Sequence, residues 1–179
     1  MTDPAAHLIE RARAGDSDAV AQLWREHRAW VAAALLAHAP RGAEIEDLLQ
    51  DVAVVFVREI KHLREAPMLR AWLRTIAVNS AVSAGRRRAA RGEADALEDD
   101  AADRRGALRA AMASDLDDIL ERVSRLSPEL REPLLLQSVR GLSQREISQI
   151  LSVPETTVET RLARARRQLR EQTRIPQKP

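Results

Sequence analysis

One stretch near the end of the chain, residues 142–170, constrains the fold more than any other, because it reads as two helices joined by a tight turn. Ser143 is followed three residues later by Glu146, a capping box that satisfies two backbone donors at a helix start. Apolar residues then recur at helical spacing up to Leu151. The pattern breaks at residues 152–153, and Pro154 suits the first turn of a second helix, where no N–H is required.

The second helix of this stretch has two different faces. Val158, Leu162, Ala165 and Leu169 form a narrow apolar stripe that faces inward. Hydroxyls and arginines lie on the other side: Thr156, Thr160, Arg164 and Arg167, flanked by Glu159, Arg161, Arg166 and Arg170. The alternative is an ordinary solvated face. Together, the capping box, the turn and the inward stripe favour a helix-turn-helix that binds DNA.

The charges of the chain are segregated although its net charge is only +2. Residues 1–92 hold 14 basic and 11 acidic side chains, residues 93–118 hold 3 and 9, and residues 119–179 hold 12 and 7. Basic ends around an acidic middle suggest nucleic acid as a partner of the ends. Lys61 and Lys178 are the only lysines. The arginine bias suits phosphate and guanine, although a GC-rich genome would also produce it.

Several classes of protein are disfavoured by what the chain lacks. It has no cysteine, which excludes disulfides and cysteine-bound zinc. Its four histidines show no metal-ligand spacing, and there is no glycine-rich phosphate loop. The longest apolar run, residues 29–39, is too short to span a bilayer. We therefore expect a cytoplasmic protein without membrane insertion that is not an enzyme and uses no cofactor or metal.

The first ninety residues read as four helices. Pro4 opens a helix that Gly15 ends, and Asp16 or Ser17 caps a second that runs to about His38. A third covers about 44–61 and a fourth about 68–88. Their inward positions are predicted to be Val20, Leu23, Trp24, Val31, Leu35 and Leu36; then Ile45, Leu48, Leu49, Val52, Val55 and Phe56; and then Leu69, Trp72, Leu73, Ile76, Ala77 and Val82. No segment alternates with period 2, so no sheet is expected.

The composition then changes to Ala, Gly, Asp, Glu and Arg, which cannot bury enough apolar surface to fold. A helix follows at about 116–126, and another begins at Pro128 and runs through Leu130, Leu134, Leu135 and Val139 to stop at Gly141. The chain is predicted to be all-α, with two small helical domains joined by a flexible acidic linker. The domains cover residues 1–90 and 115–174, the linker covers 91–114, and a disordered tail covers 175–179.

Three segments, in this order and at these separations, carry a resemblance to a known family: EDLLQDVAVVFVREI, RAWLRTIAVNSAVSAGRRR and SPELREPLLLQSVRGLSQREISQILSVPETTVETRLARARRQL. They look like conserved regions two and four of bacterial RNA polymerase sigma factors. The short length and missing middle domain match the extracytoplasmic-function (ECF) group. The resemblance implies a factor that binds core RNA polymerase and directs promoter-specific initiation at −35 and −10 elements. The alternative is a stand-alone helix-turn-helix regulator, which would not need residues 44–88.

The resemblance implies that the helix at 44–61 binds the clamp coiled coil of the polymerase β′ subunit. Its acidic edge has the chemistry to pair with arginines on a partner helix: Glu46, Asp47, Gln50 and Asp51. The alternative is a solvated face. The resemblance also implies contact with the β subunit and regulation by an anti-sigma factor.

Residues 62–88 look like the element that captures and opens the −10 region, with a base pocket expected in the loop 63–69. The residues expected to follow phosphates and base edges are Arg70, Arg74, Asn79, Ser83, Arg86, Arg87 and Arg88. Trp72 has two open interpretations, packing in the core, which its apolar neighbours favour, and stacking on a base. With only four aromatic residues, the chain lacks an extended stacking platform.

The last domain is expected to read the −35 element. The residues expected to contact base edges and phosphates are Thr156, Thr157, Glu159, Thr160, Arg161, Arg164, Arg166 and Arg167. Two residues depart from the family pattern. Glu159 stands where lysine is common and could accept from a cytosine amine, and Ser152 replaces a turn glycine. The acidic linker could imitate nucleic-acid phosphates in the polymerase channel, or serve only as a solubilising tether.

Overall fold

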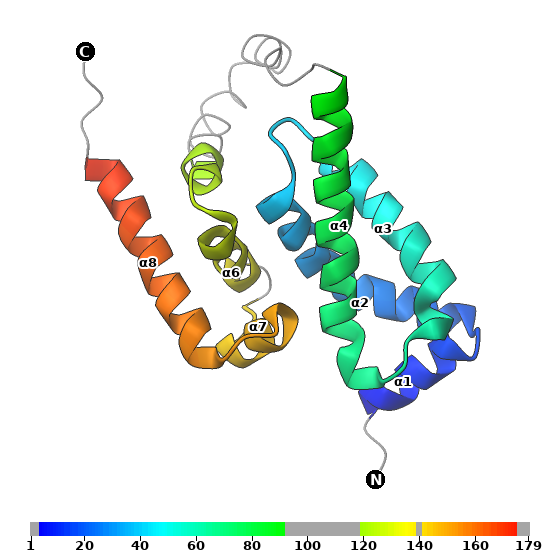
Figure 1. Cartoon of the computed structure of the whole chain (residues 1–179). Helices are drawn as coiled ribbons and strands as arrows, with labels where there is room; N and C mark the ends of the chain where they lie inside the picture. The colour runs from blue at the N-terminus through cyan, green and yellow to red at the C-terminus, as the bar shows by residue number, and fades with distance from the viewer. Residues whose placement is uncertain (1–3, 92–118, 139–140, 175–179) are drawn as a thin grey trace, which may run out of the picture.

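The structure, a computed structural model, describes residues 4–91, 119–138 and 141–174 (Figure 1). Every regular element in these residues is a helix, so the predicted all-α fold is confirmed. The predicted linker beyond Arg91 and the predicted tail, together with residues 115–118 and Val139, lie outside the described residues.

The first two helices begin and end where their capping residues predict. α1 (Pro4–Arg13) is followed by Gly15 in a left-handed conformation with φ of 91°, which glycine adopts without a steric penalty. α2 (Ser17–His38) is capped by Asp16, whose side chain accepts hydrogen bonds from the backbone N–H groups of Asp18 and Ala19 at 3.0 and 3.1 Å. This cap settles the choice between Asp16 and Ser17.

Two long helices complete the first half of the molecule. α3 (Ile45–Glu59) leads through two short 3-10 turns, η1 (Ile60–His62) and η2 (Ala66–Met68), to α4 (Leu69–Ala90). Phe56 is fully buried, with ring centroids 5.7 Å from Trp24 and 6.1 Å from Trp72. Trp72 therefore packs against the core, as its apolar neighbours indicated.

Three residues assigned to inward positions are instead exposed: Leu36, Val55 and Val82, at 40%, 37% and 40%. Each of them lies at the edge of the apolar stripe of its helix. The spacing of apolar residues alone does not show whether a position at that edge is buried or exposed. Only the packing of neighbouring helices decides such positions.

The second half contains residues 119–124, which are helical, and then α6 (Pro128–Ser138), α7 (Gln144–Leu151) and α8 (Glu155–Arg174). Both halves of the predicted capping box are present at α7. Ser152 takes the left-handed conformation with φ of 55° and ends α7, so the turn tolerates a serine at the glycine-like position. Pro154 lies just before α8 and not in its first turn, a correction of one residue.

The inward face of α6 also differs from the expectation. Glu132, Pro133 and Leu136 are buried, while Leu130, Leu134 and Leu135 are only partly buried. The sequence pattern favoured leucines over a glutamate and a proline. The helix is nevertheless rotated so that a carboxylate faces the first half of the molecule.

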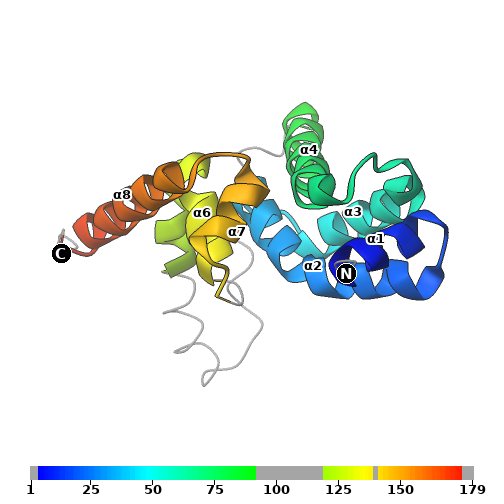
Figure 2. The same cartoon turned by 90° about the horizontal axis from the view of Figure 1, so that it is seen from below.

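The two halves of the molecule pack against each other. α2 contacts α6 and α4 contacts α7, so that α6, α7 and α8 lie along one side of the α1–α4 group (Figures 1 and 2). A single hydrophobic cluster contains residues of both halves, from Leu35 and Leu73 to Leu136, Ile147 and Val158. The fold thus brings the predicted sites of both halves onto one compact body.

Candidate functional site

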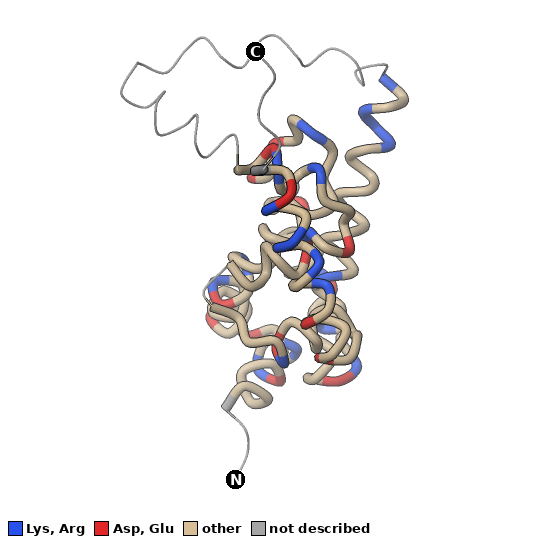
Figure 3. Tube along the Cα trace, turned by 90° about the vertical axis from the view of Figure 1, so that its left-hand side faces the viewer, with Lys and Arg blue, Asp and Glu red and all other residues tan. Residues whose placement is uncertain are grey.

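The outer face of α8 presents a basic groove. It is lined by Glu159, Thr160, Ala163, Arg164, Arg167 and Arg170 and has a volume of about 530 Å³. Val158, Leu162 and Ala165 are buried on the opposite side, so the helix turns its arginines outward. The basic residues of α8 are all arginines, and they recur along the helix (blue in Figure 3). The groove holds hydrogen-bond donors over its length and one carboxylate near its start.

Several side chains assigned to the −35 element contact neighbouring groups. Arg166 donates to Oε1 of Gln137 on α6 at 2.5 Å, and Arg167 lies 3.7 Å from Glu171. The Thr160 hydroxyl donates to the backbone oxygen of Thr156 at 2.8 Å, which leaves its oxygen free to accept. Thr156 is exposed, whereas Thr157 and Arg161 are partly buried. Arg164 is exposed and lines the groove.

The acidic edge of α3 is exposed, as the sequence indicates. It comprises Glu46, Asp47, Gln50 and Asp51, and all four side chains are accessible. Val54 and Val57 continue the same face of the helix and are each 57% exposed. Sequence reasoning missed these two valines, although they follow Gln50 by four and seven residues. A helix face with charges at one end and bare valines at the other fits a protein partner, since exposed apolar patches commonly mark interaction sites.

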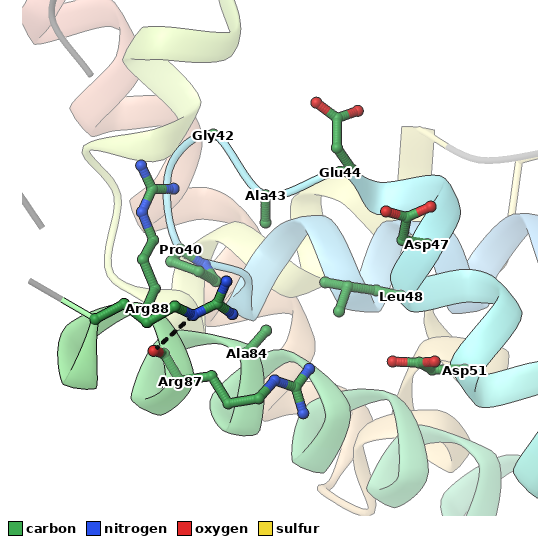
Figure 4. A pocket seen from close by; sticks show the side chains of 11 residues that line it. Pro40, Gly42, Ala43, Glu44, Asp47, Leu48, Asp51, Ala84, Arg87 and Arg88 are labelled. Atoms are coloured by element: carbon green, nitrogen blue, oxygen red, sulfur yellow. Dashed lines mark hydrogen bonds between the residues drawn. The ribbon is translucent and has the colours of Figure 1, made fainter. Parts of the chain in front are cut away.

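Part of this acidic edge also lines a groove with arginines of α4 (Figure 4). Asp47 and Asp51 lie on the α3 side, Arg87 and Arg88 come from the end of α4, and the loop at 40–43 closes one end. The groove has a volume of about 570 Å³. The fold therefore places residues predicted to bind polymerase next to residues predicted to bind DNA.

The residues assigned to the −10 element fall into two groups along α4. Toward its C-terminal end, Asn79, Ser83, Arg86 and Arg87 are exposed, and Arg88 donates to the backbone oxygen of Arg41. Toward its N-terminal end, Arg70 and Arg74 point at the second half of the molecule. In the loop 63–69 that was expected to hold a base, Leu63 and Leu69 are buried while Arg64, Glu65, Pro67 and Met68 are exposed.

Arg74 and Arg70 contact acidic residues of α6 and α7. Arg74 makes two hydrogen bonds of 2.7 Å to the carboxylate of Glu132. Arg70 lies 3.3 Å from an oxygen of Glu146 and 3.4 Å from Oε1 of Gln149. Nothing in the sequence signalled these pairs, because each joins residues from different halves of the chain.

The electrostatics of the two carboxylates follow from these contacts. Burial alone would raise the pKa of Glu132, but hydrogen bonds from His38 and Arg74 hold it below the ordinary value of 4.5. For Glu146, hydrogen bonds from the backbone and hydroxyl of Ser143 lower the pKa, and Arg70 adds to the effect. Both groups are ionised in the neutral range.

The comparisons with known proteins agree with this arrangement. Residues 23–91 match the family described as Sigma-70 region 2, and residues 116–169 match Sigma-70, region 4. The chain is 31% identical over 171 residues to the ECF RNA polymerase sigma-E factor of Escherichia coli (strain K12), covering 89% of this chain and 88% of that protein. The chain belongs to the ECF sigma factors.

Two solved structures share the fold of this sigma factor. One is CnrH in complex with the cytosolic domain of CnrY, with a TM-score of 0.69, 23% identity and coverage of 98% of this chain and 100% of that one. The other is RpoE with the anti-sigma factor NepR from Bartonella quintana, with a TM-score of 0.61, 23% identity and coverage of 88% and 98%.

Family membership decides between the two functions that the sequence left open. This sigma factor directs RNA polymerase to promoters, and the stand-alone regulator is not supported. Sigma factors are initiation factors and not enzymes. Among the helices of the described residues, none has the length and apolar character needed to cross a bilayer.

Proposed function

We propose that this sigma factor docks on core RNA polymerase through α3 and reads the two promoter elements with α4 and α8. In this division, residues 1–90 bind polymerase and the −10 element, residues 115–174 bind the −35 element, and residues 91–114 connect them. The observation that carries the proposal most directly is the exposed arginine groove of α8. This helix is the second of a helix-turn-helix whose first helix, α7, begins with a capping box.

The −35 element is read by α8 in this proposal. Arg164 is placed to fork onto guanine, since a guanidinium can donate to O6 and N7 of that base together. Thr156 and Thr160 offer hydroxyls at the start of the helix, and Arg167 suits a phosphate. Glu159 lines the same groove and favours cytosine, because a carboxylate accepts from the cytosine amine but repels phosphate.

The −10 element is bound along α4. Arg86 and Arg87 supply phosphate contacts, while Asn79 and Ser83 can donate to or accept from base edges one to two turns earlier. The exposed part of the loop, residues 64–68, is the candidate surface for an extruded base. Unstacking a base costs a few kcal/mol of free energy. Contacts between the extruded base and this loop would recover part of that cost.

Docking on polymerase uses the α3 face that combines Asp47, Gln50 and Asp51 with Val54 and Val57. The carboxylates steer the approach of a basic partner helix, and the valines provide apolar surface that becomes buried on binding. We assign the partner as the β′ clamp coiled coil, with a further contact to the β subunit. The chemistry of RNA synthesis then belongs entirely to the polymerase.

Regulation by an anti-sigma factor in the cytoplasm fits this proposal. RpoE, which shares the fold, was solved with the anti-sigma factor NepR. An anti-sigma factor that covers the α3 face or the α8 groove would block polymerase or DNA.

In vitro transcription tests the proposal. Purified core RNA polymerase is mixed with the full chain and a library of promoter fragments, and the transcripts are sequenced. We expect start sites that share one −35 and one −10 sequence and that appear only when the chain is added. Transcripts without shared upstream elements, or tight duplex binding by the chain with no promoter-specific transcript, would refute it.

A further inference from the structure

A buried carboxylate lies at the junction of three helices from both halves of the molecule. Glu132 of α6 is only 2% exposed. One of its oxygens accepts from Nε of Arg74 and the other from a terminal nitrogen of the same guanidinium, both at 2.7 Å. Nε2 of His38, at the end of α2, lies 2.9 Å from the second oxygen. Both oxygens of Glu132 are therefore engaged by groups of the first half.

This arrangement depends on the halves being packed together. A buried charge is strongly unfavourable unless it is paired and hydrogen-bonded, and Glu132 meets that condition only where α2 and α4 flank it. When the halves separate, water can solvate Glu132 and Arg74 individually. The contact therefore favours one specific packing of the two halves, and both of its charged groups can be solvated when the halves separate.

The same contact occupies an arginine that is assigned to the −10 element. Arg74 uses its Nε edge, the fork that would otherwise meet a phosphate in two parallel hydrogen bonds. One turn earlier, Arg70 lies against Glu146 and Gln149 of α7. The N-terminal part of α4 is thus covered by α6 and α7, while Arg86 and Arg87 at its other end are exposed.

We propose that Glu132 is an autoinhibitory residue, which takes the place of a DNA phosphate on Arg74 and holds the free chain closed until the two halves separate. This inference rests on the proposed −10 role of Arg74. If only open chains bind −10 DNA, the apparent dissociation constant equals that of the open form divided by the fraction of chains that are open.

A distance measurement tests the closed state by itself. The chain has no cysteine, so Ala21→Cys on α2 and Gln168→Cys on α8, both at exposed positions, allow specific spin labelling of the full chain. We expect one narrow distance distribution by electron paramagnetic resonance. Glu132→Gln should shift it to longer and broader distances, whereas Glu129→Gln, an exposed residue of the same helix, should not. Identical distributions for all three proteins would overturn the closed-state contact.

A charge exchange guards against a trivial loss of folding. Glu132→Arg places two guanidinium groups together and should open the chain further than Glu132→Gln. Combining Glu132→Arg with Arg74→Glu restores opposite charges and should restore the narrow distribution. Helical content by circular dichroism identifies any variant that fails to fold. A double variant that folds and stays open would contradict the pairing.

DNA binding tests the inhibitory effect. The probe is a fluorescent fork-junction DNA with the −10 sequence found by transcript sequencing. Glu132→Gln should bind it at least about fivefold more tightly than the unchanged chain, as expected if fewer than about a fifth of free chains are open. Equal affinities with altered distances would overturn autoinhibition. Arg74→Ala added to Glu132→Gln separates the two ideas, because unchanged DNA affinity there would refute the −10 role of Arg74 itself.

Discussion

The guanidinium of Arg70 lies 3.3 Å from the carboxylate of Glu146, the residue that closes the capping box of α7. One side chain thus completes the N-terminal cap of the helix-turn-helix and contacts the helix assigned to the −10 element. Local capping in one half of the molecule and packing between the halves share a residue, so a change at the cap affects both.

Ser143→Ala should lower the free energy of unfolding by about 0.5–2 kcal/mol, the usual effect of removing an N-cap hydroxyl. The hydroxyl accepts from the backbone N–H of Glu146 at 3.2 Å. Urea titration followed by circular dichroism measures the change. Ser138→Ala, at an exposed serine near the end of α6, is the matched control and should stay within about 0.5 kcal/mol. A Ser143→Ala effect as small as that of the control would show that the cap does not stabilise the fold.

Phe56→Ala should lower the free energy of unfolding by about 3–5 kcal/mol, because the ring is fully buried between Trp24 and Trp72. Tryptophan fluorescence during urea unfolding reports both the stability and the environment of the two neighbours. Val57→Ala, next in sequence but 57% exposed, should change stability by less than about 0.5 kcal/mol. A small effect of Phe56→Ala would contradict the placement of the core.

Acid should weaken the contact of Glu132 with His38 and Arg74. The lowered pKa of Glu132 means that its contribution is fully present above the ordinary value of 4.5 and is lost as the pH falls through the lowered pKa. Label distances measured between pH 7 and pH 3 should show opening at acid pH in the unchanged chain. Glu132→Gln lacks this titration, so its distances should depend less on pH. Parallel pH curves for the two proteins would contradict the assignment.

Asp47→Arg combined with Asp51→Arg should raise the dissociation constant for core polymerase by about 100-fold, since opposed like charges cost several kcal/mol. Both carboxylates are exposed on α3, so the fold should be unaffected. Glu10→Arg combined with Glu26→Arg makes the same change in net charge on exposed residues of α1 and α2. Fluorescence anisotropy with labelled chain measures binding. Normal affinity of the α3 double variant would refute the docking surface.

Arg164→Ala should weaken recognition at one −35 position by about 1–3 kcal/mol if the guanidinium reads a base. Binding to duplexes substituted one base pair at a time measures the loss, with Arg25→Ala on the exposed face of α2 as the control. A uniform loss over all sequences would identify Arg164 as a phosphate contact instead.

Local signals in the sequence predicted most helix ends. Asp16, Gly15, Ser143 and Glu146 each act within one turn of the chain, so their effects can be read without knowledge of the rest. The exposed arginine face of α8 could be predicted for the same reason, because its inward stripe is regular. The order of the segments was enough to indicate the family.

Features that depend on contacts between distant segments could not be predicted. The rotation of α6 buries Glu132, and this burial is favourable only because Arg74 and His38 lie beside the carboxylate. Both partners are far from Glu132 in sequence. Val54 and Val57 look like core residues in a list of apolar positions, yet no helix of the described residues covers them. Such assignments require the packing of the whole molecule.

Because one hydrophobic cluster runs from α2 through α6 to α8, we expect the free molecule to unfold thermally as a single cooperative unit. Heat that melts the helix-turn-helix also removes apolar cover from α2, so a calorimetric scan of the unchanged chain should contain one endotherm whose van't Hoff and calorimetric enthalpies agree. Once the halves part, each retains only its own smaller core, and the scan should then resolve into two.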